Sequence, residues 1–390
     1  MKRIGLYLGF PPNGGGAFQY AQSILAATLA LPAEYDIVIA HAHPAWLHLL
    51  QAHVSRAALL PMPRDRLAPL VHLLLRQGFP AALWRMAARH LHPWTRRLLA
   101  QGCDLWICPA QDVLTYALPA RTMGVIHDLM HRYERRFPEV SRHGLFNRRE
   151  RHYRNICSAA SVVLVDSQVG KSHVIEAYGT GTGRIHILPY VAPPYMQNQE
   201  PADFESRYRL PASFIFYPAQ FWRHKNHVRL LQALAIALEA VPDLNLVLAG
   251  SRKNAYADVL QAIEDLHLQH RVMLVGYVPD EDMPGFYRRA RGLVMPTFFG
   301  PTNIPPLEAM MAGCPMAVSN VYAMPEQVGD AALLFDPHSV DDIAQAIVCL
   351  VTDEALRARL SEAGKKRAQA WGQRHFEARF HQIVQSVTGA

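Results

Sequence analysis

The feature that most constrains this 390-residue chain is a succession of short apolar runs, each followed by a stretch with helical periodicity. Continuous apolar runs, unlike alternating ones, are typical of parallel strands buried on both faces. The runs form two series: 4–8, 37–40, 105–108, 122–126, 162–166 and 185–188, then 214–218, 244–249, 272–275, 292–295, 316–319 and 332–335. Two such series predict two doubly wound, Rossmann-like α/β domains.

The length agrees with this prediction, because 390 residues exceed what one hydrophobic core usually supports. The proline-rich segment 189–201 is the natural linker, which gives domains of residues 1–190 and 191–372. In doubly wound folds, ligands bind outside the carboxyl ends of the strands. We therefore expect the two sheets to present these ends to a shared cleft.

Composition excludes several classes of protein. Half of the residues are hydrophobic, without a low-complexity or strongly charged tail, so disorder is not expected. No apolar run reaches the length of a membrane-spanning helix, and the apolar part of the first ten residues suits a strand better than a signal peptide. The five cysteines have no metal-ligand spacing. Unpaired thiols in a reducing cytoplasm are the simplest explanation, and we expect a cytoplasmic protein without a metal site.

The net charge of +7 is concentrated between Arg64 and Arg97, where arginines alternate with leucines and tryptophans. Nucleic-acid binding is not predicted, because no basic and aromatic recognition motif accompanies the charge. Two interpretations of the segment remain open. It is either a helix lying on an anionic membrane or an ordinary amphipathic helix pair whose basic face is solvated.

The richest motif is residues 295–320, MPTFFGPTNIPPLEAMMAGCPMAVSN. A strand should end near Pro296, and a helix should open near Pro305 and end at Gly313. A helix start that follows a strand directs backbone N–H groups and the positive end of a dipole at one place, which suits a phosphate. Glu308 would then accept hydroxyl protons beside the anion, for instance from a ribose. The alternative is a solvated Glu favoured by the helix dipole.

Other polar residues follow the predicted strands where a ligand is expected. Asn13-Gly14-Gly15-Gly16 comes after the first strand and either approaches a ligand closely or only makes a tight turn. His127 ends the strand 122–126. Lys225 follows 214–218 and suits a diphosphate, with Arg223 as a second cation, unless this is merely a solvated basic loop.

The segment around Glu308 resembles the donor-site signature of the family 4 (group 1) retaining glycosyltransferases, E-G-F-G-L-P-x-L-E-A-M-A-x-G-x-P-V. The residues that match it are Pro305, Leu307, Glu308, Ala309, Met310, Gly313 and Pro315. Gly300 stands where the family has its first Glu, and Pro301-Thr302-Asn303 replaces G-F-G. In the family's G-R-x-x-x-x-K motif, Lys225 matches the Lys, but Gln220 stands where the Arg is usual. This sequence therefore resembles a variant subgroup with FGPTNIPPLEA.

The resemblance implies the GT-B fold, in which the last helix, here about 373–390, crosses back to the first domain. It also implies the roles of individual residues. His127, Lys225 and Glu308 would carry catalysis. Gly15, Gly16, Gln220, Arg223, Gly250, Tyr277, Val278, Thr302, Asn303 and Ile304 would bind the donor. Thr302, Asn303 and the amides near Ile304 would take over hexose recognition from the missing acid at 300, and Asn13 and His131 would lie on the acceptor side.

The implied activity is retaining, metal-independent transfer of a hexose from a nucleotide-diphosphate sugar, without a cofactor, to a glycan or lipid-linked glycan of a bacterial surface polysaccharide. Peripheral contact with an anionic membrane through residues 64–97 would fit a lipid-linked acceptor. Two alternatives remain: a non-catalytic sugar-nucleotide-binding subunit, suggested by Gly300 and Gln220, or a phosphorylase or epimerase of the same fold.

Overall fold

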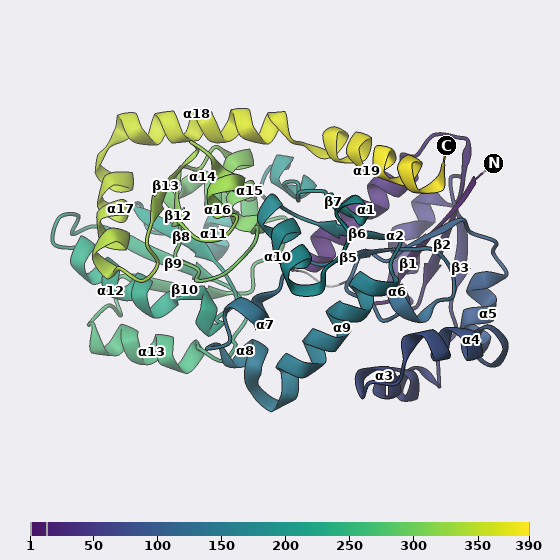
Figure 1. The fold of residues 1–390 in the computed structure, drawn as a ribbon. Coiled ribbons are helices and arrows are strands. Elements are labelled where there is room, and N and C mark those ends of the chain that lie inside the picture. The colour runs from purple at the N-terminus through teal and green to yellow at the C-terminus, as the bar shows by residue number, and fades with distance from the viewer. Residues whose placement is uncertain (1, 13–14, 390) are drawn as a thin grey trace. The chain divides into compact units, whose positions relative to one another are not determined.

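The computed structural model describes residues 2–12 and 15–389, and the chain divides into two compact units (Figure 1). Unit 1 comprises Met1–Arg135, Val140–Tyr190 and Gln373–Ala390. Unit 2 comprises Arg136–Glu139 and Val191–Gly372. The sequence-based division into 1–190 and 191–372 does not include the assignment of Arg136–Glu139 to unit 2. The composition of this short segment does not mark it as a domain boundary.

In the described part of unit 1, seven parallel strands form one sheet in the order β3-β2-β1-β4-β5-β6-β7. The chain order reverses between β1 and β4, the position where doubly wound sheets open a crevice. The edge strand β3 was not predicted, because its four residues are largely solvent-accessible and include a proline. The strands are β1 (Lys2–Leu8), β2 (Tyr35–His41), β3 (Ala58–Pro61), β4 (Leu105–Ile107), β5 (Thr122–Val125), β6 (Val162–Val165) and β7 (Ile185–Ile187).

Helices cover both faces of this sheet, and two buried clusters of apolar side chains lie beneath them. The last helix, α19 (Gln373–Thr388), packs against α1, where the rings of Tyr20 and Phe376 are 5.9 Å apart. The other helices of unit 1 are α1 (Gly16–Leu29), α2 (Ala45–Leu50), η1 (Gln51–His53), α3 (Ala68–Arg76), α4 (Ala81–Leu91), α5 (Pro93–Leu99), α6 (Leu114–Ala117), α7 (Met130–Tyr133), η2 (Arg142–Gly144), α9 (Leu145–Ala159), α10 (Gln168–Tyr178) and η3 (Thr182–Arg184); α8 (Pro138–Ser141) begins in unit 2.

Unit 2 contains six described parallel strands in the order β10-β9-β8-β11-β12-β13, again reversing in the middle, between β8 and β11. Four of its strands have the predicted limits, because proline, asparagine or aspartate stands at or just after the carboxyl end of each apolar run. The strands are β8 (Phe214–Pro218), β9 (Asn245–Ala249), β10 (Val272–Gly276), β11 (Gly292–Met295), β12 (Met316–Ser319) and β13 (Ala332–Phe335).

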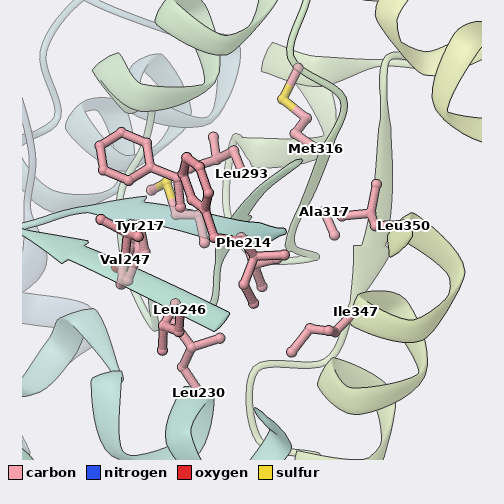
Figure 2. Close-up of a cluster of buried hydrophobic side chains, with 14 of the residues drawn as sticks. Phe214, Tyr217, Leu230, Leu246, Val247, Leu293, Met316, Ala317, Ile347 and Leu350 are labelled. Atoms are coloured by element: carbon pink, nitrogen blue, oxygen red, sulfur yellow. The ribbon is translucent and has the colours of Figure 1, made fainter. Parts of the chain in front are cut away.

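The core of unit 2 lies between this sheet and its helices (Figure 2). Leu230 of α12 and Ile347 and Leu350 of α17 are fully buried against side chains of the central strands, such as Leu246 and Ala317. The helices are η4 (Pro194–Gln197), α11 (Phe204–Tyr208), η5 (Arg223–Lys225), α12 (His227–Ala237), α13 (Tyr256–Asp265), α14 (Met283–Arg289), α15 (Ile304–Ala312), α16 (Met324–Val328), α17 (Val340–Thr352) and α18 (Glu354–Ala370).

Helix α15 begins and ends as the motif predicts. It starts after Asn303, which has extended backbone angles, and prolines stand in its first turn, where a missing N–H is tolerated. It ends at Gly313, whose φ of 69° is the left-handed conformation that glycine adopts readily. Within residues 2–12 and 15–389, no helix is both long and apolar enough to cross a membrane.

Candidate functional site

Two loops of unit 2 meet at the point where its strand order reverses. One loop follows β8 and contains η5, and the other follows β11 and leads into α15. Lys225 Nζ donates to Asn303 Oδ1 at 3.1 Å, so a hydrogen bond joins two residues that the sequence assigned to the site. The backbone N–H of Phe298 donates to the His224 carbonyl at 2.8 Å and holds the same loops together. Lys225 is half-buried, unlike a lysine in a merely solvated basic loop.

Asn303 is held from three sides. Its backbone N–H donates to Gln327 Oε1 at 3.0 Å, and Gln327 Nε2 donates to the Asn303 carbonyl at 2.6 Å. Its side-chain amide contacts Met324 Sδ at 3.2 Å. Because only 9% of Asn303 is exposed, its amide group has a fixed orientation toward Lys225.

The side chain of Asn303 leaves no room for a side chain at Gly300. A Cβ atom added at Gly300 would lie 2.1 Å from Asn303 Nδ2, a separation that real Cβ atoms do not reach. Two of the positions that depart from the family signature, 300 and 303, are therefore linked sterically. The amide of Asn303 occupies space that a side chain at position 300 would need.

The start of α15 contains two prolines, Pro305 and Pro306, which lack N–H groups. Fewer backbone donors are therefore available to an anion than at an ordinary helix start. The dipole of the helix remains, and the ammonium group of Lys225 supplies a full positive charge close by.

Glu308 lies in the second turn of α15 and is only 3% exposed, so the alternative of a solvated Glu is wrong. The hydroxyl of Tyr287 donates to its Oε2 at 2.7 Å, and the hydroxyl of Tyr195 donates to its Oε1. Burial raises the pKa of Glu308, although the two tyrosine hydrogen bonds act to lower it. Neither tyrosine was predicted, since Tyr195 belongs to the expected linker and Tyr287 to a helix without a motif.

Sequence reasoning also missed Glu139, which comes from the excursion Arg136–Glu139. Its Oε1 accepts from the backbone N–H of His224 at 3.1 Å and contacts His224 Nδ1 at 2.7 Å, and its Oε2 accepts from Asn254 Nδ2 at 2.9 Å. Burial alone would raise the pKa of Glu139, but these hydrogen bonds outweigh it and hold the pKa at about 2. The carboxylate therefore fixes the loop that carries Lys225.

The predicted diphosphate residues Gln220 and Arg223 have partners elsewhere in unit 2. Gln220 is exposed, and its Oε1 accepts from Trp222 Nε1 at 2.9 Å. Arg223 is exposed and forms an ion pair with Asp258 on α13 at 3.0 Å. An anion would have to compete with Asp258 for this guanidinium group.

The loops after β9 and β10 approach the loop after β8 closely. The N–H of Gly250 donates to the Gly276 carbonyl at 2.7 Å. A Cβ at Gly250 would lie 2.3 Å from the Ala219 carbonyl oxygen, so only glycine fits there. Tyr277 is 67% exposed and Val278 is buried, so Tyr277 offers an accessible ring at this edge.

Thr302 and Ile304 flank Asn303, and both are half-buried. Ile304 is the first residue of α15. The predicted hexose-recognition segment is thus one turn that continues into a helix, and the side chain of Asn303 binds Lys225.

In unit 1, Gly15 and Gly16 open α1, and the Gly15 carbonyl accepts from Phe18 and Gln19 N–H groups at 3.0 and 3.1 Å. Gly15 has a φ of 118°, which favours glycine. Asn13, predicted on the acceptor side, lies outside the described residues.

His127 follows β5 at the carboxyl edge of the first sheet. Its Nδ1 is 2.6 Å from the Tyr190 hydroxyl, and the ring of Tyr20 from α1 meets it edge-on at 5.4 Å. Its buried Nε2 has no hydrogen-bond partner among residues 2–12 and 15–389. Burial lowers the pKa of His127 to about 4, although Asp128 acts to raise it, so the imidazole is neutral near pH 7. With Tyr190 donating to Nδ1, Nε2 carries the proton and is a buried donor.

His131 is more deeply buried than His127. It is fully buried, and its Nε2 contacts Glu150 Oε2 at 3.1 Å. Arg132 and Arg154 bind the same carboxylate. Contact between His131 and an acceptor would require this network to open.

Comparison with known proteins agrees with the geometry of unit 2. Residues 198–367 match the model of the family described as Glycosyl transferases group 1, which supports the resemblance inferred from the sequence. The chain is 31% identical over 216 residues to O-antigen chain mannosyltransferase B of Escherichia coli, an alignment covering 54% of this chain and 57% of that protein. It is 26% identical over 241 residues to mannosylfructose-phosphate synthase of Agrobacterium fabrum, covering 58% of this chain and 52% of that enzyme. Each alignment spans less than two thirds of the relative.

Among solved structures, HepE of Anabaena in complex with UDP and glucose has a TM-score of 0.72 and 17% identity, over 99% of this chain and 100% of that one. Sucrose-phosphate synthase of Thermosynechococcus elongatus has a TM-score of 0.69 and 18% identity, over 100% of both chains. These likenesses show the fold. The predicted GT-B class, with two Rossmann-like doubly wound domains, is confirmed, whereas the shared cleft stays a prediction.

The coupling between Gly300 and Asn303 is testable by thermal unfolding. Gly300→Ala should destabilise the protein by about 1–3 kcal/mol, the scale of an overpacked site, because its Cβ collides with the Asn303 amide. In an Asn303→Ala background the collision is gone, so Gly300→Ala should cost much less.

Gly183→Ala is the matched control, because a Cβ there has no neighbour within 4 Å. Additive effects of the 300 and 303 substitutions, or a Gly300→Ala variant as stable as Gly183→Ala, would contradict the coupling.

Proposed function

We propose that the protein is a retaining, metal-independent hexosyltransferase, which moves a hexose from a nucleotide-diphosphate sugar to a hydroxyl group of a glycan. The observation that carries the proposal is the Lys225–Asn303 contact at the strand-order reversal of unit 2, inside the segment that matches the group 1 family model. A doubly wound sheet binds its ligand at this position.

In the proposed reaction the bond between the sugar and the nucleotide diphosphate breaks, and negative charge develops on the leaving phosphate. The ammonium group of Lys225 and the dipole of α15 are placed to stabilise that charge. The acceptor hydroxyl attacks from the face that the phosphate leaves, and the phosphate takes its proton. The configuration at the sugar carbon is thereby retained.

Glu308 and His127 have supporting roles in this proposal. Glu308, oriented by Tyr195 and Tyr287, accepts a hydrogen bond from a hydroxyl group of the nucleotide ribose. Neutral His127 donates from Nε2 to a hydroxyl of the sugar, a role that its low pKa favours over charge stabilisation. No cofactor takes part.

The relatives suggest the sugar and the setting. Several are named mannosyltransferases, one of them for O-antigen chains, so we propose mannose as the first hexose to test and a surface polysaccharide as the product. A solved neighbour binds UDP-glucose. UDP-, GDP-, dTDP- and ADP-sugars should therefore be compared by thermal shift, because a ligand that binds the folded state raises its stability.

Lys225→Ala and His127→Ala should each lower turnover at least about tenfold, the scale of lost charge stabilisation or positioning. Turnover is measured as release of the nucleoside diphosphate, with and without a glycan acceptor. The controls are Lys366→Ala, whose side chain is 74% exposed, and His270→Ala, also at the surface.

Wild-type rates in both site variants would reject the site. Binding of nucleotide sugars without transfer or hydrolysis would favour the alternative of a non-catalytic binding subunit. Release driven by inorganic phosphate would favour a phosphorylase, and conversion of the donor sugar into its epimer would favour an epimerase.

The acceptor proposed here includes lipid-linked glycans, with the protein in the cytoplasm at the inner face of the plasma membrane. Of the fifteen large hydrophobic side chains that are exposed among the described residues, eight lie between Leu67 and Leu91. Met86 and Leu91 are 71% and 76% exposed. An ordinary amphipathic helix pair would bury such side chains, so the membrane interpretation of this segment is favoured.

The charge of the segment also suits an anionic bilayer. Residues 64–97 contain seven arginines and one acidic residue, Asp65. One acidic residue against seven arginines leaves the segment strongly positive, and arginines such as Arg66 and Arg89 are exposed. Exposed leucines mixed with arginines bind the surface of an anionic membrane rather than crossing it.

A variant with Leu83→Ser, Met86→Ser and Leu91→Ser should sediment at least about tenfold less with phosphatidylglycerol vesicles, because each inserted apolar side chain contributes on the order of 1 kcal/mol. Ile236→Ser with Leu334→Ser is the control, since these unit 2 side chains are 42% and 41% exposed. Membrane contact would be rejected if the wild-type protein does not sediment with anionic vesicles, or if the triple variant binds them as well as the wild type does.

A further inference from the structure

Four consecutive residues, Arg136–Glu139, belong to unit 2 although the chain before and after them belongs to unit 1. This 136–139 segment contacts three loops at the carboxyl edge of the unit 2 sheet, which follow β8, β9 and β11. The loops after β8 and β11 carry Lys225 and Asn303. A segment far away in the sequence is therefore in contact with the loops of the candidate donor site.

Glu139 caps the start of the short helix η5. Trp222, the residue before this helix, supplies no side-chain cap. Instead, the N–H of His224 donates to Glu139 Oε1 at 3.1 Å, and the N–H of Arg223 donates to Asn254 Oδ1 at 3.1 Å. Asn254 Nδ2 in turn donates to Glu139 Oε2 at 2.9 Å. The N–H groups at a helix start have no partner within the helix, so two connected side chains from elsewhere satisfy them here.

The imidazole of His224 also binds Glu139, with its Nδ1 at 2.7 Å from Oε1. Only 7% of the Glu139 side chain is exposed. Although burial acts to raise it, hydrogen bonds from His224 and Asn254 hold the pKa of Glu139 at about 2, so the carboxylate is ionised across the neutral range. Moving η5 away would leave this charge buried without its partners, which is strongly unfavourable.

Phe137 joins the 136–139 segment to the loop after β11. Its ring stacks on that of Phe298, with the centroids 5.6 Å apart and both side chains buried. The guanidinium group of Arg136 lies 4.6 Å from the centroid of the Phe298 ring. Since the Phe298 N–H donates to the His224 carbonyl, His224 is bound by Glu139 on one side and by the loop after β11 on the other. The segment therefore holds both loops together.

The backbone of Lys225 is fixed within η5. Its N–H donates to the Trp222 carbonyl at 3.0 Å, and its carbonyl accepts from the Tyr217 hydroxyl at 2.9 Å. A charged group stabilises a leaving phosphate best when its place is set before the reaction, and small displacements of such a group slow the chemical step. Because Glu139 binds η5 at the residue before Lys225, it sets the place from which the ammonium group acts.

We propose that Glu139 is a positioning residue for sugar transfer, which caps η5 and thereby holds Lys225 at the diphosphate of the donor. The proposal rests on the proposed function, since it concerns the donor of that reaction. Glu139 is not placed to bind the donor itself, because both of its oxygens accept from protein groups and its side chain is buried. Phe137 supports the same arrangement from the loop after β11.

The binding test uses isothermal titration calorimetry of the full chain with UDP, GDP and the matching monophosphates. Lys225 is assigned to the leaving phosphate, which a monophosphate lacks. Glu139→Ala should therefore weaken binding of the preferred diphosphate about tenfold and leave its monophosphate nearly unchanged. Glu139→Gln keeps an acceptor for the His224 N–H and should lose less. Glu362→Ala, at a side chain that is 61% exposed, is the control and should bind as the wild type does.

A double-mutant cycle on turnover separates positioning from a general loss of structure. Glu139→Ala should lower kcat about tenfold when Lys225 is present and should have little further effect in a Lys225→Ala background, because its effect passes through that lysine. Thermal unfolding of each variant checks that it is folded. If Glu139→Ala does not fold, Glu139→Gln and Asn254→Ala decide, since Asn254 is exposed and its loss removes one half of the cap.

Three results would overturn the inference. The first is diphosphate binding and turnover by folded Glu139→Ala that equal those of the wild type. The second is equal weakening of monophosphate and diphosphate, which a merely structural role produces. The third is a loss of kcat as large without Lys225 as with it. A wild type that neither binds nucleotide nor turns over any donor rejects the proposed function instead.

Discussion

The candidate donor site depends on one buried amide, the side chain of Asn303. It joins the loops on either side of the strand-order reversal in unit 2 by accepting from Lys225 at 3.1 Å. It lies in the space that a side chain at position 300 would occupy. A neutral amide thus contacts the lysine where the related signature has an acid nearby. A carboxylate neighbour would offset the positive charge of Lys225, whereas the neutral amide does not. Lys225 therefore attracts a phosphate more strongly than it would beside a carboxylate.

The sequence was sufficient to predict the two parallel sheets, because buried parallel strands are continuous apolar runs and glycine or proline bounds most of them. The edge strand β3 was not predicted, because Ala58–Pro61 is short and half-exposed. Its sequence therefore lacks the continuous apolar run that marks a buried strand. Lys225, Asn303 and Glu308 could be named from their positions after strands. Tyr195, Tyr287 and Glu139 could not, because they reach the site through tertiary contacts from a linker, a helix and a four-residue excursion.

In both units the strand order reverses in the middle of the sheet, but the side chains near the reversal differ. In unit 2 a lysine and a helix start suit a diphosphate. In unit 1 the corresponding reversal of strand order lies beside a cavity lined by Trp84, Trp94, Asp65 and Asp112. A transferase needs one site for a charged donor and another for an uncharged acceptor.

The most direct test of the central claim is to follow the hydrolysis of an α-linked nucleotide sugar by proton NMR in the absence of any acceptor. Transfer to water from the face that the phosphate leaves should release the α-anomer first, before mutarotation, together with the nucleoside diphosphate. This release should be at least about tenfold slower with Lys225→Ala, because the leaving phosphate loses its cation. Initial release of the β-anomer, or no release above the protein-free rate for any donor, would contradict a retaining transferase.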